Sequence, residues 1–291
     1  MTLRGVRAYH TPENQQAVVD LLSEHGDGAL IVAGGSFVHG LIARGLLTEL
    51  DGIVDVGRLP LAYLRSGADG VRIGATTRFI DIQRDAGVQT SAALGALHDA
   101  LEHPPRQVLN AATVGGCVAA SCPFFDVPIA LLALDARVTA FGPSGERGIA
   151  LEDFFTGLFD NALTDGELVT EVHIPAPAGG SASGFAKLEA NANDLAILNA
   201  AAMVSVDAQG RCTAARIFVG GGVGETPVRA VSAEQALIGQ PLTEASCSNA
   251  GRAGRDDVAP ISDHRATASY RSSVVAPFIK RALLQARARL A

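Results

Sequence analysis

Two Gly-Gly pairs, each preceded by apolar or small residues, are the strongest chemical signal in this sequence. The first lies in Ile31–Phe37 and the second, much later in the chain, in Ala111–Cys117. A glycine has no Cβ, so its amide can approach a phosphate closely and its φ can be positive, which lets successive N–H groups point into one concavity. Together the two pairs predict a cradle for one anionic ligand of pyrophosphate size.

Each pair taken alone has a structural alternative, namely a strand-to-helix turn for the first and a tight bend for the second. Neither pair fits G-x-G-x-x-G or a P-loop, which argues against a nicotinamide Rossmann site and a nucleoside triphosphatase. A helix expected from Ser36 would present free N–H groups and its positive dipole end to a phosphate. Asp126 could accept hydrogen bonds from ligand hydroxyls or cap the helix that follows it, and these roles are compatible.

Metal ligands and a nucleophile are not indicated by the sequence. The histidines show no H-x-x-x-H or H-E-x-x-H spacing, and the four cysteines are scattered, so we expect buried reduced thiols. One of them, Cys117, lies beside the second glycine pair, where it would line a ligand pocket. A chain with no catalytic cluster of its own is typical of a protein whose cofactor supplies the chemistry.

Composition restricts the class of protein. With 291 residues, of which 48% are hydrophobic, the chain can bury a large core in roughly two or three lobes. The net charge of −7 and the lack of a basic cluster argue against a nucleic-acid partner. No apolar run is long enough to span a bilayer and the first ten residues have no apolar core, so we expect no membrane span, no signal peptide and a cytoplasmic location.

The strands and helices that position the glycines are predicted from hydrophobic periodicity and from residues that end helices. A small lobe, 1–57, should place the first pair between a buried strand and a helix, and Thr11 is the expected N-cap of its first helix. Its expected elements are a helix over Pro12–His25, a strand over Ala29–Ala33, a helix over Ser36–Leu47 and a strand over Ile53–Val56.

A second lobe is expected over 58–176, followed by a Pro, Gly and Ser-rich linker over 177–183. Its expected strands are Val71–Ala75, Ala136–Phe141 and Leu168–Ile174. Its expected helices are one that starts at Thr77, one over Ser91–Glu102 and one over Asp126–Asp135. The remaining unit, 184–291, should be an α+β domain with a three-stranded antiparallel sheet backed by helices. Its expected strands are Gly184–Leu188, Ala201–Val206 and Ala214–Val219.

Four segments in order closely resemble one family, the FAD-binding medium subunits of molybdenum hydroxylases, which include carbon monoxide dehydrogenase and xanthine dehydrogenase. They are Ile31–Ser36, Thr113–Gly116, Ala120–Asp126 and, near the end, Ala259–Arg271. This resemblance covers essentially the whole chain. It implies an α+β protein with the two-subdomain FAD-binding fold of the vanillyl-alcohol oxidase (PCMH) type, followed by a C-terminal α+β domain.

The resemblance also implies a set of FAD-binding residues. Residues of the two glycine segments would hold the pyrophosphate, Asp126 would contact the ribityl chain or flavin, and Lys187 and Leu195 would lie beside the isoalloxazine ring. The full set is Ile31, Val32, Ala33, Gly34, Gly35, Ser36, Phe37, Val38, Thr113, Val114, Gly115, Gly116, Cys117, Ser121, Asp126, Lys187 and Leu195.

The sequence departs from the family's usual residues at three positions in or next to these segments. Leu109 stands where the family often has arginine, Cys117 where it often has asparagine, and Leu195 where some members have a tyrosine that stacks on the flavin. The aliphatic residue at the third position is similar to the xanthine dehydrogenase branch.

The function implied is that of an electron-transfer subunit without catalytic residues of its own. Electrons from a molybdopterin centre on a large partner would pass through [2Fe–2S] clusters on a small partner to this FAD, and then to an external acceptor, in a dimer of heterotrimers. Two alternatives stay open at this point. One is a free-standing FAD-dependent oxidase of a small organic substrate, and the other is a nucleotide-binding module without enzymatic activity.

Overall fold

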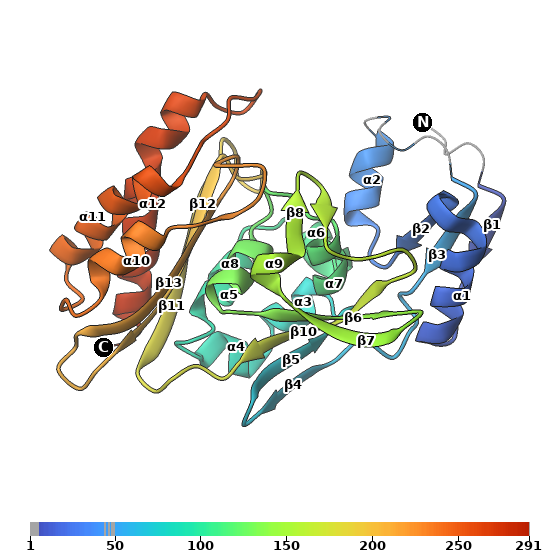
Figure 1. Ribbon diagram of the computed structural model, residues 1–291, viewed down its shortest axis with the longest axis horizontal. Helices are drawn as coiled ribbons and strands as arrows, with labels where there is room; N and C mark the ends of the chain where they lie inside the picture. The colour runs from blue at the N-terminus through green and yellow to red at the C-terminus, as the bar shows by residue number, and fades with distance from the viewer. Residues whose placement is uncertain (1–5, 44, 46, 48–49, 291) are drawn as a thin grey trace.

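The structure is a computed structural model that describes residues 6–43, 45, 47 and 50–290. Within these residues the strands form sheets of three, five and four strands and a two-stranded hairpin. The three sheets follow one another along the long axis of the molecule in chain order, from the N-terminal unit through a central unit to the C-terminal unit (Figure 1).

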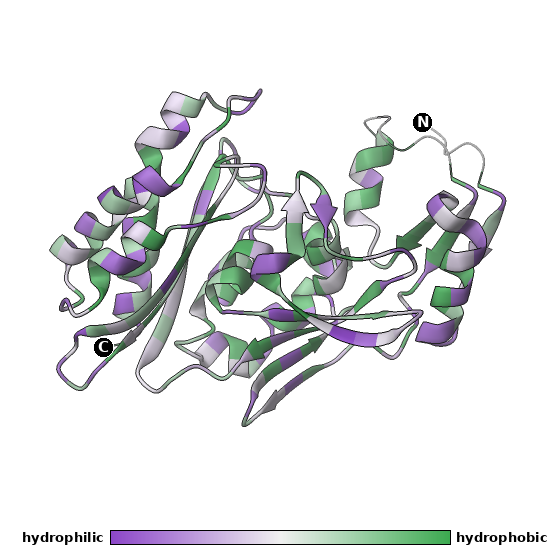
Figure 2. Ribbon diagram, viewed as in Figure 1, coloured by the Kyte–Doolittle hydropathy of each residue, from purple (hydrophilic) through white to green (hydrophobic). Residues whose placement is uncertain are grey.

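The N-terminal unit is a parallel three-stranded sheet of order β1-β3-β2 with helices packed against it. Strand β2 is apolar along its whole length (Figure 2). Val18 and Val19 of the first helix pack with Val54 of β3 in one buried cluster. Its elements are β1 (Ala8–His10), α1 (Gln15–His25), the 3-10 turn η1 (Gly26–Gly28), β2 (Ala29–Val32), α2 (Ser36–Ala43) and β3 (Gly52–Asp55).

Helix boundaries in this unit differ from those expected. Asn14 is the N-cap of α1, because its side chain accepts a hydrogen bond from the amide of Ala17 at 2.9 Å, so the predicted cap at Thr11 is wrong. Both residue types cap helices well, and periodicity alone does not choose between them. Helix α2 ends at Ala43, and residues 44 and 46 of its predicted extension lie outside the described residues.

The central unit is an antiparallel sheet of order β4-β5-β10-β6-β7 with short helices on it. Every residue of α8 is buried, as expected for a helix that is apolar on all sides. The predicted helices over Ser91–Glu102 and Asp126–Asp135 are longer than the helices α5 and α8 that the structure has there. The elements are β4 (Leu64–Gly67), β5 (Gly70–Gly74), α3 (Phe79–Gln83), α4 (Ala86–Thr90), α5 (Gly95–Ala100), α6 (Arg106–Ala111), α7 (Val114–Ala119), α8 (Val127–Ala133), β6 (Arg137–Gly142), β7 (Gly145–Ala150), α9 (Leu151–Phe154), β8 (Phe155–Gly157), β9 (Asp160–Asn161) and β10 (Leu168–Pro175).

The C-terminal unit is an antiparallel sheet of order β11-β12-β13-β14, with one short strand, β14, beyond the three expected. Its own helices cover one face, and α5 and α8 of the central unit pack on the other. Strand β12 therefore alternates between two cores, with Ala201 in the central core and Ala200 and Ala202 in the C-terminal one. The elements are β11 (Ser181–Leu188), β12 (Leu198–Val206), β13 (Cys212–Gly220), β14 (Val228–Arg229), α10 (Val231–Leu237), α11 (Glu244–Ala253), η2 (Gly254–Asp257) and α12 (Ala268–Ala288).

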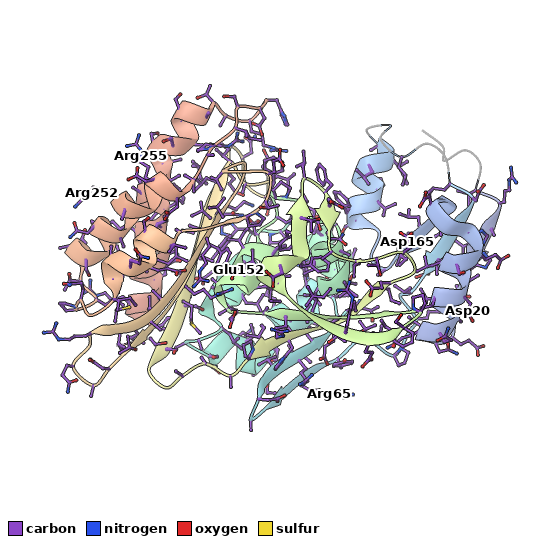
Figure 3. The ribbon with its side chains drawn as sticks, in the orientation of Figure 1. Asp20, Arg65, Glu152, Asp165, Arg252 and Arg255 are labelled. Carbon is purple, nitrogen blue, oxygen red and sulfur yellow. The ribbon has the colours of Figure 1, made fainter. Side chains whose placement is uncertain are left out.

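The two larger units are also joined by ion pairs. Glu152, labelled in Figure 3, accepts from Arg216 at 2.7 Å and from Arg229 at 3.5 Å, and both arginines come from the C-terminal sheet. Arg216 also donates to the carbonyl oxygen of Leu132 in α8 at 2.8 Å. These contacts fix the C-terminal sheet against the central helices.

The predicted linker is partly strand, because β11 already begins at Ser181. Ser183 is fully buried and its hydroxyl donates to the carbonyl oxygen of Ala93 at 2.6 Å. A Cβ on Gly184 would lie 2.5 Å from the carbonyl oxygen of Ala282 in α12. The small residues here therefore permit close packing of helices on the strand, a use that composition does not distinguish from a flexible linker.

We expect Gly184→Ala to lower the free energy of unfolding by about 1–3 kcal/mol, because the new methyl group overlaps the backbone of α12. Gly179→Ala is the matched control, since a Cβ at Gly179 meets nothing within 4 Å, and its effect should stay within about 0.5 kcal/mol. Urea unfolding of the purified chain measures both. Equal stability of the two variants would show that α12 does not need the close approach.

Candidate functional site

The first glycine segment runs from the end of β2 into the first turn of α2. Gly35 has a φ of +66°, a left-handed conformation that favours glycine. The first hydrogen bond of α2 joins the amide of His39 to the carbonyl oxygen of Gly35 at 2.8 Å. The amides of Ser36, Phe37 and Val38 therefore have no acceptor within the helix, and they lie at its positive end. This turn has the free amides that the predicted anion site requires, and anion binding itself stays a prediction.

The second glycine segment is a helical turn, α7, and its amides are used within the protein. Val114 donates to the carbonyl oxygen of Thr77 at 3.0 Å and Gly115 donates to that of Ala75 at 2.9 Å. Gly116 donates to the hydroxyl of Thr113, the N-cap, at 3.3 Å. The expectation that successive amides of both glycine pairs point into one concavity is therefore wrong for the second pair.

In the second pair, Gly115 allows close packing and Gly116 leaves backbone exposed. A Cβ on Gly115 would lie 2.5 Å from the Cβ of Ala75, so a side chain there would push α7 away from the end of β5. Gly116 is exposed and leaves a stretch of backbone uncovered at the surface. The second segment thus offers a surface that a ligand can approach closely, without a row of free donors.

Tertiary structure brings the two segments into contact. A Cβ on Gly34 would lie 1.7 Å from the carbonyl oxygen of Ala111, the residue that ends α6 just before the second segment. The ring of Phe37 packs edge-on against Phe125, with centroids 5.7 Å apart, and stacks on Phe159 at 6.1 Å. Ile31–Phe37 therefore contacts both the start of Ala111–Cys117 and the segment before Asp126.

Sequence reasoning missed the role of Phe159. It lies at the tip of the β8–β9 hairpin, half exposed, with a φ of +60°, which is rare for a bulky residue. Its amide donates to the carbonyl oxygen of Ser121, which is itself buried at a φ of +44°. No spacing in the sequence marks this contact, because the hairpin and the glycine turns are far apart in the chain.

Asp126 occupies the N-cap position of α8, but its side chain does not cap the helix. Its carboxylate instead accepts from the ammonium of Lys187 in β11 at 2.9 Å and from the amide of Asn199 in β12 at 2.8 Å. Burial raises the pKa of the Asp126 carboxyl, and the contacts with Lys187 and Asn199 oppose that increase. The cluster thus joins the central unit to the C-terminal sheet.

The ammonium of Lys187 has three oxygen neighbours, and its contact with Oε2 of Glu189 is an ion pair without a hydrogen bond. Besides Asp126, its ammonium contacts Glu189 at 2.9 Å and the carbonyl oxygen of Asp194 at 2.6 Å, and the side chain is only 2% exposed. Asp194 in turn accepts from the backbone amide of Leu195, which is half buried. Lys187 and Leu195, both predicted to lie beside the ring, are therefore linked through Asp194.

The C-terminal segment Ala259–Arg271 contacts the residues next to this cluster. Arg265 donates to the Asp194 carboxylate at 2.9 Å, and this contact lowers the pKa of that carboxyl. Arg271 is fully buried, pairs with both oxygens of Asp263 at 2.9 Å and donates to the carbonyl oxygen of Ile197 at 3.0 Å. The segment that resembles the family's C-terminal signature therefore holds the turn that contains Leu195 in place.

The four cysteines are buried, as predicted. Burial raises the pKa of the Cys117 thiol well above its usual value, so the thiol is protonated at neutral pH. Across the described residues no three His, Cys, Asp or Glu side chains gather in a way that could hold a metal ion. No helix in the described part of the chain is long and apolar enough to cross a membrane, and the cytoplasmic location stays a prediction.

Comparisons with known proteins agree with this geometry. Residues 4–177 match the FAD binding domain in molybdopterin dehydrogenase, and residues 183–286 match the CO dehydrogenase flavoprotein C-terminal domain. The two matches confirm the predicted α+β fold, in which an FAD-binding domain precedes a C-terminal domain.

Individual relatives cover nearly the whole chain. It is 33% identical to the 6-hydroxypseudooxynicotine dehydrogenase complex subunit alpha of Paenarthrobacter nicotinovorans, over 96% of this chain and 93% of that protein. It is 31% identical to the carbon monoxide dehydrogenase medium chain of Afipia carboxidovorans, over 97% and 96%. A solved carbon monoxide dehydrogenase structure from Hydrogenophaga pseudoflava superposes with a TM-score of 0.93 at 30% identity, covering 100% of both chains.

We expect Lys187→Met to lower the free energy of unfolding by about 3–5 kcal/mol near pH 8, because it leaves buried Asp126 without its cation. The loss should be smaller near pH 5. Without Lys187 the already raised pKa of Asp126 rises further, and a group whose folded-state pKa is raised contributes stability that is present at low pH and lost as pH rises.

Urea unfolding of the purified chain at the two pH values measures this difference. Lys280→Met is the matched control, because it removes an ammonium from the exposed pair with Glu244, 2.7 Å apart, and should have little effect at either pH. A loss in Lys187→Met that does not change with pH would contradict the assignment to Asp126.

Proposed function

The chain belongs to the FAD-binding medium subunits of the molybdenum hydroxylase family, and we propose that it relays electrons through FAD to an external acceptor. In this proposal the electrons come from [2Fe–2S] clusters of a small partner subunit, which receives them from a large molybdopterin-binding subunit, in a dimer of heterotrimers. The observation that carries the proposal is that the two glycine segments touch, at Gly34 and Ala111, next to the free amides at the start of α2.

The first glycine segment fits the pyrophosphate of FAD. The amides of Ser36, Phe37 and Val38 can donate to phosphate oxygens at the positive end of α2. Gly35 supplies the left-handed turn that aims them, and exposed Gly116 leaves room for the phosphates on the other side. We propose that the pyrophosphate binds mainly through the first segment.

The rest of the proposed FAD surface surrounds this turn. Asp126 retains acceptor capacity for a ribityl hydroxyl, since a carboxylate can accept about four hydrogen bonds and two are in use. Lys187 is buried and pairs with Asp126 and the backbone of Asp194, so its proposed part is to hold Asp126 and the turn of Leu195 in place. The other residues proposed for this surface are Ile31, Val32, Ala33, Gly34, Thr113, Val114, Gly115, Cys117 and Ser121.

Bound FAD would supply a centre that exchanges single electrons with clusters and electron pairs with an acceptor. The residues of this chain bind the cofactor, orient it and exclude water from one side. The aromatic cluster of Phe37, Phe125 and Phe159 provides such an apolar wall beside the first segment.

We expect Gly35→Val to lose most bound FAD while keeping the fold, because a β-branched residue disfavours the φ of +66° that aims the amides. Gly239→Val is the matched control. Gly239 has a φ of +76° and a Cβ there would meet no atom within 4 Å, so the variant carries similar backbone strain away from the site. Visible absorbance of both proteins after reconstitution gives the FAD stoichiometry.

Co-purification distinguishes the remaining possibilities. A wild-type chain without flavin absorbance after reconstitution would refute the proposed function, and equal FAD content in the two valine variants would refute the cradle. Recovery of FAD together with molybdenum and iron–sulfur subunits supports the electron relay. A chain that retains FAD, has no partners and is reduced directly by a small organic substrate would support the free-standing oxidase instead.

A further inference from the structure

The two glycine segments contain no charged side chain. Neither Ile31–Val38 nor Ala111–Cys117 includes a lysine or an arginine, and the nearby carboxylate of Asp126 is an acceptor. The first turn of α2 offers about half a positive charge through the helix dipole, whereas a pyrophosphate carries a negative charge on each phosphate. The cradle therefore leaves negative charge without a cation, unless a neighbouring side chain supplies one.

Arg78 lies opposite Thr113, at the start of the second glycine segment. The two residues form an isolated antiparallel bridge. Its two hydrogen bonds, each 3.0 Å long, join backbone amides to carbonyl oxygens of the flanking residues: Phe79 to Ala112, and Val114 to Thr77. Arg78 and Thr113 are therefore a non-hydrogen-bonded pair, and in such pairs the Cβ atoms lie roughly 4.5–5.5 Å apart on the same face.

The side chain of Thr113 shows which face this is. Its hydroxyl accepts from the amide of Gly116 at 3.3 Å, and a Cβ on Gly116 would lie 2.9 Å from that hydroxyl oxygen. Gly116 is exposed and leaves backbone uncovered. Arg78 thus leaves the bridge on the same face as this uncovered backbone, where a long side chain can extend over the surface that the second glycine segment offers to a ligand.

The guanidinium of Arg78 is available for a further anion. Its Nε donates to Asp81 at 2.9 Å and its Nη2 at 3.3 Å, and Nη1 has no acceptor among the described residues. The side chains of Arg78 and Asp81 are 54% and 46% exposed, and an ion pair with such exposure is weak. The planar fork of an arginine matches two oxygens of a phosphate.

We propose that Arg78 is a phosphate-binding residue of the FAD site. It supplies, from the side of the second glycine segment, the positive charge that the amides of α2 do not provide. The inference rests on the proposed function, because it requires the pyrophosphate to lie between the two segments. In this arrangement α2 donates neutral amides to the phosphates from one side, and Arg78 neutralises them from the other.

The test is equilibrium binding of FAD to the full-length chain after removal of flavin, followed by quenching of flavin fluorescence. Arg78→Gln should lower the affinity for FAD by roughly tenfold or more, because a charge-assisted hydrogen bond to phosphate is lost. Its affinity for riboflavin, which has no phosphate, should equal that of the wild type. Arg78→Lys keeps the charge without the fork and should lose less than the glutamine variant.

Salt dependence gives a second readout, which a purely structural role would not change. Wild-type affinity for FAD should fall between about 0.05 and 0.5 M NaCl, because salt screens the contact of an exposed cation with phosphate. In Arg78→Gln the fall should be clearly smaller. Arg84→Gln is the matched control, since it removes an exposed arginine at the other end of α3, and it should keep the wild-type affinity and salt dependence.

Asp81→Asn separates phosphate binding from the ion pair with Asp81. It breaks the same pair but keeps the guanidinium, so affinity for FAD should stay equal to that of the wild type or rise. Equal losses in Asp81→Asn and Arg78→Gln would overturn the proposal, as would wild-type affinity and salt dependence in Arg78→Gln. A wild-type chain that binds no FAD refutes the proposed function itself.

Discussion

The buried ammonium of Lys187 is the interaction on which the arrangement of the site depends. A charge with 2% exposure is tolerated only when it is paired, and its oxygen neighbours are the carboxylates of Asp126 and Glu189 and the backbone carbonyl of Asp194. Asp126 directly precedes α8, Glu189 directly follows β11, and Asp194 lies in the turn before β12. Pairing one cation thus fixes the central unit, the C-terminal sheet and the Leu195 turn relative to one another.

The four glycines of the two Gly-Gly pairs have different structural roles. Gly34 and Gly115 allow backbones to approach more closely than any Cβ would permit. Gly35 supplies a left-handed turn, and Gly116 keeps a surface open. The first amides of α7 already donate to Thr77, Ala75 and Thr113, so we propose that anion binding falls mainly to the first turn of α2. This asymmetry follows from hydrogen bonds that α7 makes with the end of β5.

The C-terminal signature shows how a recognisable segment can act at a distance from a ligand. Buried Arg271 uses its guanidinium to bind Asp263 and the carbonyl oxygen of Ile197, which ties the last helix to the start of β12. Arg265 from the same segment holds Asp194. The signature is therefore explained by the positioning of the Leu195 turn, and no contact with a cofactor is needed to account for it.

The sequence alone determined the fold class, the family and the first glycine turn, because periodicity, Gly-Gly pairs and ordered segments are local signals. It could not show that Gly34 touches Ala111, that Asp126 pairs with Lys187, or that Phe159 packs on Phe37. It also misjudged the amides of the second glycine pair, and it did not show that β11 begins at Ser181, within the predicted linker. Small residues look alike in composition whether they bend, flex or permit close packing, and only the partners that tertiary structure places against them decide which role they have.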